Sequence, residues 1–167
     1  GYVAKKNYRG EWLWAKAITT TAEPEGGGEK SFIKKLKVDI NGDVVIVGYY
    51  KYNSFFAGQD ILTDDGVSKV VVAKLNSNGD LYWVKSAGSI TENTYFDEVT
   101  TDLNGDIYIS GSINDGEDVV FGDVTIPKAD NNIRCIVKID KDGNWLWANA
   151  IKSTGVSVSS GGMHTDM

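Results

Sequence analysis

The stretch "DINGDVVIVG" at Asp39–Gly48 returns with few changes as "DLNGDIYISG" at Asp102–Gly111. The two turn glycines, Gly42 and Gly105, lie 105 − 42 = 63 positions apart. In each copy an Asn-Gly turn precedes a run rich in β-branched residues, which is typical of a β-strand. A motif that returns at this distance predicts a chain built from repeated units.

A second motif occurs three times and predicts a hairpin in each case. It spans Val3–Ile18, Val72–Ala87 and Val137–Ile151. Each version has a turn glycine followed by a tryptophan, and the pairs are Gly10 with Trp14, Gly79 with Trp83, and Gly143 with Trp147. The tryptophan spacings are 83 − 14 = 69 and 147 − 83 = 64, so the repeat is roughly 64 residues long.

The longer first interval has a local cause. The stretch "TTTAEPEGGGEK" at Thr19–Lys30 contains Pro24 and three consecutive glycines. This composition is typical of a flexible surface loop. Such an insertion is tolerated because the entropy of loop closure grows slowly with length.

The third unit shows four strand patterns most clearly. They are Phe96–Asp102, Gly105–Ile113, Ile133–Asp140 and Asn144–Ile151. The turns "LNGD", "SNGD" and "KDGN" place glycine where a tight hairpin needs a positive φ. We therefore predict an all-β chain of four-stranded antiparallel units.

A repeat of this length with four antiparallel strands is typical of a β-propeller blade, because a single blade must stack on others to bury its faces. The boundaries predict the last two strands of a blade at residues 1–18, blades at 32–87 and 96–151, and a tail or the start of a further blade at 152–167. That makes about two and a half blades, whereas a closed propeller needs roughly four to eight. We expect either a longer propeller or several chains that complete one another.

Recurring positions predict contacts between blades. Gly48 and Gly111 share one place in the second strand, where a missing side chain would let the next blade approach. Trp14, Trp83 and Trp147 share one place in the fourth strand, which favours packing between blades; stacking on a sugar is the alternative. Two positions earlier, and expected on the same face, are Trp12, Leu81 and Trp145.

These motifs resemble the bacterial β-propeller-type repeats called SBBP. The similar segments are "VVVAKLNSNGDLYWVKSAG", "DEVTTDLNGDIYISGSI" and "VVFGDVTIPKADNNIRCIVKIDKDGNWLW", and the likeness runs from Tyr2 to about Ile151. The chain departs from the pattern at Arg134 and Cys135, where an acidic-aromatic pair is usual. The resemblance implies a propeller fold and an extracellular or cell-surface location, and it implies no catalytic residues.

Composition excludes several classes of protein. The net charge is −6, and no cluster of Lys and Arg is interleaved with aromatic residues, so we expect no nucleic-acid binding. The sequence has no run of about 18 apolar residues, so we expect no membrane span, and it has no signal-peptide pattern. The single cysteine, Cys135, cannot form an intrachain disulfide, and its apolar neighbours predict a small buried side chain.

The repeated aspartate turns suggest calcium sites at first sight. Asp39, Asn41 and Asp43 alternate around one turn, and Asp102, Asn104 and Asp106 around the other. Alternating oxygen ligands can hold Ca²⁺, but the distal bidentate carboxylate of an EF-hand is missing. We favour hairpin turns stabilised by aspartate side chains, with calcium as the alternative.

Enzyme chemistry has little support in the sequence. The only histidine, His164, lies in the tail, so no Ser-His-Asp or Cys-His relay can be centred in the predicted fold. A pair of carboxylates could act as glycosidase acids, and the candidates are Asp97, Glu98, Glu117 and Asp118. We favour solvated surface carboxylates and assign no catalytic, cofactor or metal residue.

Three hypotheses follow. The first is a non-enzymatic, extracellular or cell-surface propeller segment that serves assembly or adhesion through exposed blade edges, with rings or filaments of the chain as one form. The second is a carbohydrate-binding, lectin-like propeller, whose binding depends on loop residues. The third is a fragment of a propeller glycosidase, whose hydrolysis depends on a carboxylate.

Overall fold

The computed structural model describes residues 1–20, 31–61, 69–88, 94–113, 118–128, 133–151 and 162–165. These residues form strands and turns, and the all-β class expected from the sequence is confirmed. In this part of the chain there is no helix that could span a membrane.

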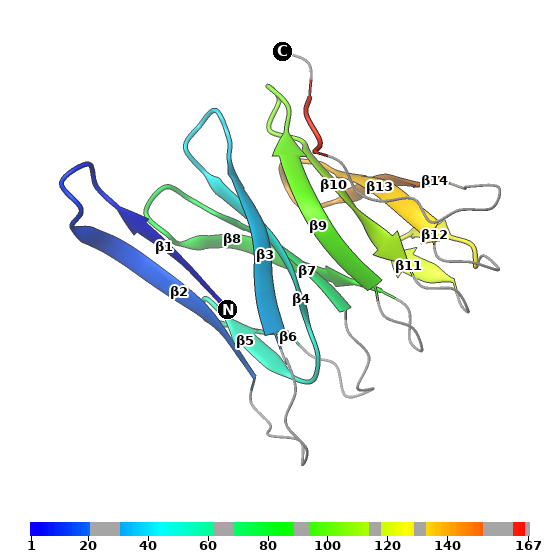
Figure 1. Ribbon diagram of the computed structural model, residues 1–167, viewed down its shortest axis with the longest axis horizontal. Coiled ribbons are helices and arrows are strands. Elements are labelled where there is room, and N and C mark those ends of the chain that lie inside the picture. The colour runs from blue at the N-terminus through cyan, green and yellow to red at the C-terminus, as the bar shows by residue number, and fades with distance from the viewer. Residues whose placement is uncertain are drawn as a thin grey trace.

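Most strands belong to three four-stranded sheets (Figure 1). The N-terminal sheet consists of β1 (Tyr2–Lys6), β2 (Trp12–Thr20), β5 (Ser54–Phe56) and β6 (Gln59–Ile61). The middle sheet consists of β3 (Ser31–Val38), β4 (Val44–Tyr50), β7 (Lys69–Leu75) and β8 (Leu81–Ala87). The C-terminal sheet consists of β9 (Thr94–Thr101), β10 (Ile107–Ile113), β13 (Ile133–Ile139) and β14 (Trp145–Ile151).

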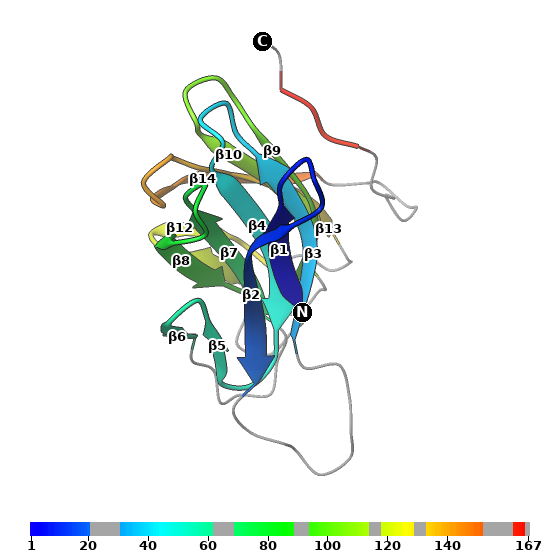
Figure 2. The same cartoon turned by 90° about the vertical axis from the view of Figure 1, so that its left-hand side faces the viewer.

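The predicted four-stranded antiparallel unit is confirmed in the middle and C-terminal sheets. In each sheet every strand pairs antiparallel with the next of the four in chain order. The three sheets follow one another side by side in chain order (Figures 1 and 2). The described sheets do not close into a ring, so the propeller arrangement remains a prediction.

The core lies between the sheets, in two clusters on opposite faces of the middle sheet. Successive residues of a strand point to opposite faces. Val44 and Ile46 of β4 therefore pack toward the N-terminal sheet, in a cluster with Val3 and Ile18. Val45 and Val47 pack toward Ile107, Ile109 and Val137 of the C-terminal sheet.

Two short hairpins, which the sequence analysis missed, tie each repeat to the sheet before it. β5 belongs to the second repeat in sequence, yet it pairs with β2 of the first, with Ile18 opposite Phe56. The second hairpin joins β11 (Val119–Phe121) and β12 (Val124–Ile126), and Val120 bridges Gly88 just after β8. Neighbouring sheets are thus linked by backbone hydrogen bonds as well as by side-chain packing.

The expectation that Gly48 and Gly111 let the next blade approach is wrong. A Cβ at Gly48 would collide with the Phe32 carbonyl oxygen, and one at Gly111 with the Tyr95 carbonyl oxygen. Both obstacles belong to the neighbouring strand of the same sheet, not to the next sheet. At both positions the register shifts by one residue, so the glycines accommodate a β-bulge in the first strand.

The expectation that Trp12 and Trp145 share a face with Trp14 and Trp147 is also wrong. A bulge separates the two positions, because Lys5 lies opposite Trp14 while the next residue of β1 lies opposite Trp12. A shift of one residue moves a side chain to the other face of a sheet. Accordingly, Trp145 contacts Phe121 inside the core at a ring distance of 5.2 Å, whereas Trp147 is exposed.

Candidate functional site

The N-terminal and middle sheets are joined by a tryptophan that contacts a turn. Trp14 Nε1 donates a hydrogen bond to the Ser77 carbonyl oxygen at 3.2 Å, and Lys5 Nζ donates to the same oxygen at 2.7 Å. Gly79 in that turn has φ +85°, and an added Cβ would lie 2.6 Å from the Trp14 ring. The turn needs glycine both for its backbone and for the ring that packs on it.

The same contact joins the middle and C-terminal sheets. Trp83 Nε1 donates to the Lys141 carbonyl oxygen at 3.1 Å. Gly143 has φ +90°, and a Cβ there would lie 2.9 Å from the Trp83 ring. We call this arrangement, an indole N–H on a turn carbonyl with the ring against a turn glycine, the tryptophan–turn contact. The prediction that these tryptophans pack between repeats is confirmed for Trp14 and Trp83.

Each end of the molecule presents one half of an unfilled tryptophan–turn contact. Trp147 is 37% exposed, and its indole N–H has no acceptor in the described part of the chain. At the other end, Gly10 has φ +83° with nothing within 4 Å of an added Cβ. The third tryptophan and the third turn are therefore both present and both open.

Exposed apolar side chains surround the two open halves. In the turn with Gly10, Tyr8 is 90% exposed, and just after it Trp12 is 65% exposed. At the far end, Ile151 is 43% exposed, whereas its counterpart Ile18 is buried in the cluster between the N-terminal and middle sheets. These side chains are exposed because no neighbouring sheet covers them. By contrast, the middle sheet is covered by the sheet on either side of it.

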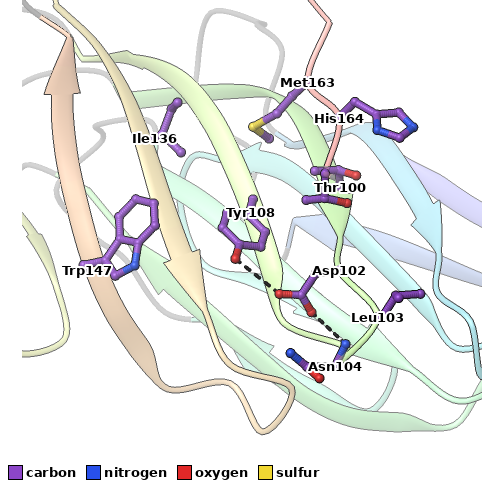
Figure 3. A pocket seen from close by; sticks show the side chains of 10 residues that line it. Thr100, Asp102, Leu103, Asn104, Tyr108, Ile136, Trp147, Met163 and His164 are labelled. Carbon is purple, nitrogen blue, oxygen red and sulfur yellow. Dashed lines mark hydrogen bonds between the residues drawn. The ribbon is translucent and has the colours of Figure 1, made fainter. Parts of the chain in front are cut away.

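A cavity of about 620 Å³ lies on the open face of the C-terminal sheet (Figure 3). Tyr108, Ile136 and Trp147 line it from the sheet, and Met163 lines it from residues 162–165. The Tyr108 hydroxyl donates to Asp102 Oδ2 at 3.2 Å. The cavity thus combines aromatic faces with polar groups at one rim.

The segment 162–165 lies against the first strand of the C-terminal sheet. The Thr165 hydroxyl donates to the Thr101 carbonyl oxygen at 2.8 Å. The His164 ring points away from Tyr108 and Trp147 (Figure 3). This placement does not bring His164 into a catalytic relay among the described residues.

The aspartate turns have the geometry expected of side-chain-stabilised hairpins. Asp39 Oδ1 accepts the backbone N–H groups of Asn41 at 2.9 Å and Asp43 at 3.0 Å. In the second turn, Asp102 Oδ1 accepts the backbone N–H groups of the matching residues, Asn104 and Asp106, at 2.9 and 3.0 Å. One carboxylate oxygen thus holds each turn closed.

A lysine ammonium forms an ion pair with an aspartate of each of these turns. Lys74 Nζ lies 3.0 Å from Asp39 Oδ2, and Lys138 Nζ lies 2.8 Å from Asp106 Oδ2. The hydrogen bond to Asp106 raises the pKa of Lys138 above its usual value. Within the described ranges, no group of three or more His, Cys, Asp or Glu side chains could hold a metal ion. The calcium hypothesis therefore gains no ligand cluster from this part of the chain.

The candidate catalytic carboxylates have other partners. Asp97 accepts two hydrogen bonds from Arg134 Nη2, at 3.0 and 3.2 Å, and Glu98 pairs with Lys35 at 3.1 Å. Asp118 Oδ1 accepts the backbone N–H of Lys128 at 2.9 Å. Glu117 lies outside the described residues. The structure does not bring Asp97, Glu98 or Asp118 to the cavity beside Trp147.

Cys135 is a buried side chain on the inner face of the C-terminal sheet. Its exposed fraction is 0%, as its apolar surroundings in the sequence indicate. Burial raises the pKa of the thiol to about 12, although Arg134 opposes the shift. A thiol with this pKa has almost no thiolate at neutral pH and is a poor nucleophile.

Sequence analysis missed the residues that accept the tryptophan hydrogen bonds. Ser77 and Lys141 both act through a main-chain carbonyl, which leaves no side-chain signal. The sequence signal for these residues is their position, two residues before the turn glycine. Tyr8 occupies the same position in the first turn.

Comparison with protein-family models and with curated proteins gives no match for this chain. The resemblance to SBBP repeats therefore stays a prediction from the motifs.

Proposed function

We propose that the chain is a non-enzymatic segment of propeller-type repeats that serves assembly or adhesion through its open faces and strand edges. The observation that carries this proposal is the tryptophan–turn contact, which is filled twice inside the molecule and open once at each end. An extracellular or cell-surface location is part of the proposal and rests on the resemblance alone.

The driving force would be the one that already stacks the described sheets. Burying apolar surface contributes about 25 cal/mol per Å², and exposed side chains of this kind flank both open halves. Strand addition would contribute backbone hydrogen bonds, since β2 already accepts β5 at its edge. Both terms favour a partner that presents another sheet of the same build.

The test is the mass of the 167-residue chain in solution by light scattering, together with negative-stain images of the same sample. We expect species of several chains, seen as rings, short rods or fibres. A monomer across the accessible concentration range would refute self-assembly. Adhesion would then require a foreign surface, tested by binding of the chain to bacterial cells.

A second candidate is carbohydrate binding at the cavity beside Trp147. The exposed Trp147 and the half-buried Tyr108 line the cavity with aromatic rings, and Asp102 and Asn104 line it with polar groups. Glycan-array binding lost in Trp147→Ala, and kept in Tyr82→Ala at another exposed aromatic, would support it. The absence of binding to any glycan would reject it.

Glycoside hydrolysis is the weakest of the three hypotheses. Asp97 and Glu98 are held in ion pairs, and an acid–base pair needs access to a bound sugar. Release of reducing sugar that disappears in Asp97→Asn or Glu98→Gln would revive it.

A further inference from the structure

The first turn of the chain has the geometry of the two turns that receive a tryptophan. Asn7 Oδ1 accepts the backbone N–H groups of Arg9 at 2.9 Å and Glu11 at 3.0 Å. Asn76 does the same for its turn, and Asp140 for the third. The turn around Gly10 is therefore preformed, and the Tyr8 carbonyl stands where Ser77 and Lys141 accept.

The third tryptophan is placed like the two that donate. Lys138 lies opposite Trp147 across β13 and β14, as Lys74 lies opposite Trp83 and Lys5 lies opposite Trp14. Equal register places all three rings on the same face of their sheets. Trp147 therefore points away from the middle sheet, toward the side on which a further sheet would stack.

We infer that the open face of the C-terminal sheet binds the N-terminal sheet of a second copy of this chain. Trp147 Nε1 of one copy donates to the Tyr8 carbonyl of the next, and the indole ring packs on Gly10. This inference rests on the proposed function and names its partner and its contact atoms.

The side chains around the two halves fit this arrangement. In the internal interfaces, Val71 and Ala73 pack toward the sheet that precedes them. Their counterparts in the N-terminal sheet are Tyr2 and Ala4, and Trp12 is the counterpart of Leu81. In the second copy these side chains would face Ile136 and Trp147.

The strand positions of the C-terminal open face also favour this occupant. Residues 162–165 lie beside β9, and Thr165 of "HTD" holds the place in the sequence repeat that Thr101 holds in "TTD" and Val38 in "KVD". This segment therefore stands at the first-strand position of a further sheet. β1 and β2 are the third and fourth strands of their repeat. A second copy would therefore supply the third and fourth strands of the further sheet.

The proposed contact is heterologous, because it joins two different surfaces of the same chain. Such a contact continues from copy to copy and forms a ring or a filament. The open face carries Arg134 and Lys138 in ion pairs, so part of it is polar. We therefore expect reversible association that grows with protein concentration.

Two variants, each of which breaks one half of the contact, test this inference. Trp147→Leu removes the donor and the ring, and Gly10→Asn places a side chain where the ring should pack. Asparagine tolerates positive φ, and Gly10 has open space around it, so the variant should fold. We expect each variant alone to have the mass of one chain at concentrations where the wild type assembles.

A mixture of the two variants gives the sharper result. The Gly10→Asn copy keeps an intact Trp147, and the Trp147→Leu copy keeps an intact Gly10 turn. One contact can therefore form between them, while both outer ends stay blocked. We expect light scattering to show the mass of two chains in the mixture and no larger species.

Matched controls separate this contact from general effects of substitution. Gly58→Asn makes the same change at another positive-φ glycine with nothing within 4 Å of an added Cβ. Tyr82→Leu removes an exposed aromatic residue from the fourth strand of the middle sheet. Both controls should assemble like the wild type, and circular dichroism should show β-sheet in all variants.

The outcomes distinguish this inference from the proposed function. If the wild type assembles and both variants assemble equally well, self-assembly stands but uses another surface, and the inference fails. If the wild type is a monomer at every concentration, both fail, and the open face is covered by something other than a second copy. If Trp147→Leu does not fold, Gly10→Asn with its Gly58→Asn control decides the question.

Discussion

The middle and C-terminal sheets share strand order, turns and register, yet the central strands β4 and β7 of the middle sheet are buried on both faces, whereas β10 and β13 of the C-terminal sheet are buried on one. The strands β7 (KVVVAKL) and β13 (IRCIVKI) show the difference. In β7 every residue after Lys69 is buried, whereas in β13 buried residues alternate with half-buried ones. The two repeats thus share one backbone arrangement, while the burial of each face depends on whether another sheet covers it.

Each sheet has a face that it turns toward the next sheet in chain order, and we call this its outward face. The composition of the two outward faces explains the contrast between the middle and C-terminal sheets. Val45 and Val47 of β4 correspond to Tyr108 and Ser110 of β10, and Val70 of β7 corresponds to Arg134 of β13. Valine is suited to burial under another sheet, whereas the partly buried Arg134 forms an ion pair with Asp97. Only near Trp147 and Ile136 is the open face of the C-terminal sheet as apolar as the corresponding face of the middle sheet, which is buried.

The largest expected effect comes from a charge at matched positions of the two outward faces. Val72→Asp in the middle sheet would bury a carboxylate without a partner, and we expect a loss of about 4 kcal/mol or more in unfolding free energy. Ile136→Asp at the matching position should cost about 1 kcal/mol, because water reaches that face. Urea denaturation followed by circular dichroism measures both. Equal losses would mean that the two faces are equally buried.

Alanine at the turn glycines should give the next largest contrast. Gly79→Ala strains a positive-φ residue and displaces the Trp14 ring, so we expect a loss of about 2–4 kcal/mol. Gly10→Ala carries the backbone strain alone and should cost about 1 kcal/mol. The two unfolding curves, measured below the concentration of assembly, test this difference. If Gly10→Ala were as damaging, the ring contact would contribute little at Gly79.

The sequence alone predicts part of this structure. The "NGD" and "DGN" turns and the tryptophan repeats predict the strands of the third unit within two residues at each end. They succeed because turn residues and alternation act locally, through φ preferences and pleating. The repeat also predicts that the tryptophans pack between repeats, because side chains that recur at one place in each repeat meet the same environment.

The bulges and the hairpin pairing could not be predicted in this way. A bulge adds a single residue, and no residue type around Leu13 marks the shift that sends Trp12 and Trp14 to opposite faces. The β5–β6 hairpin has a two-residue turn at Ala57 and Gly58, yet its pairing with β2 joins segments far apart in the chain. Both features depend on tertiary contacts, which local patterns do not encode.

Removing the indole N–H alone should have a smaller effect. Trp83→Phe keeps a ring against Gly143 but leaves the Lys141 carbonyl without its donor, and we expect a loss of about 1–2 kcal/mol. Trp147→Phe should change monomer stability by less than about 0.5 kcal/mol, because its N–H has no acceptor within the described chain. Denaturation of both variants, measured on monomers, checks the contrast. A comparable loss in Trp147→Phe would reveal an intramolecular partner.

The smallest effect concerns the inner faces, where Cys135 occupies the position that Val71 holds in the middle sheet. At pH 7 Cys135→Val should change stability by less than about 1 kcal/mol, because it is a nearly volume-conserving change. At alkaline pH the two proteins should diverge. Burial raises the pKa of the folded thiol to about 12, while an unfolded thiol ionises near pH 8.5.

The sign of that divergence follows from proton binding. Above about pH 8.5 the unfolded state releases a proton that the folded state keeps, so rising pH favours unfolding until the folded pKa is passed. Wild type should therefore lose about 1 kcal/mol more than Cys135→Val between pH 7 and pH 9.5. Urea denaturation at the two values measures it, and the valine variant cancels the titration of lysines and tyrosines. Rapid reaction of the folded thiol with a disulfide reagent at pH 8 would contradict the burial on which this expectation depends.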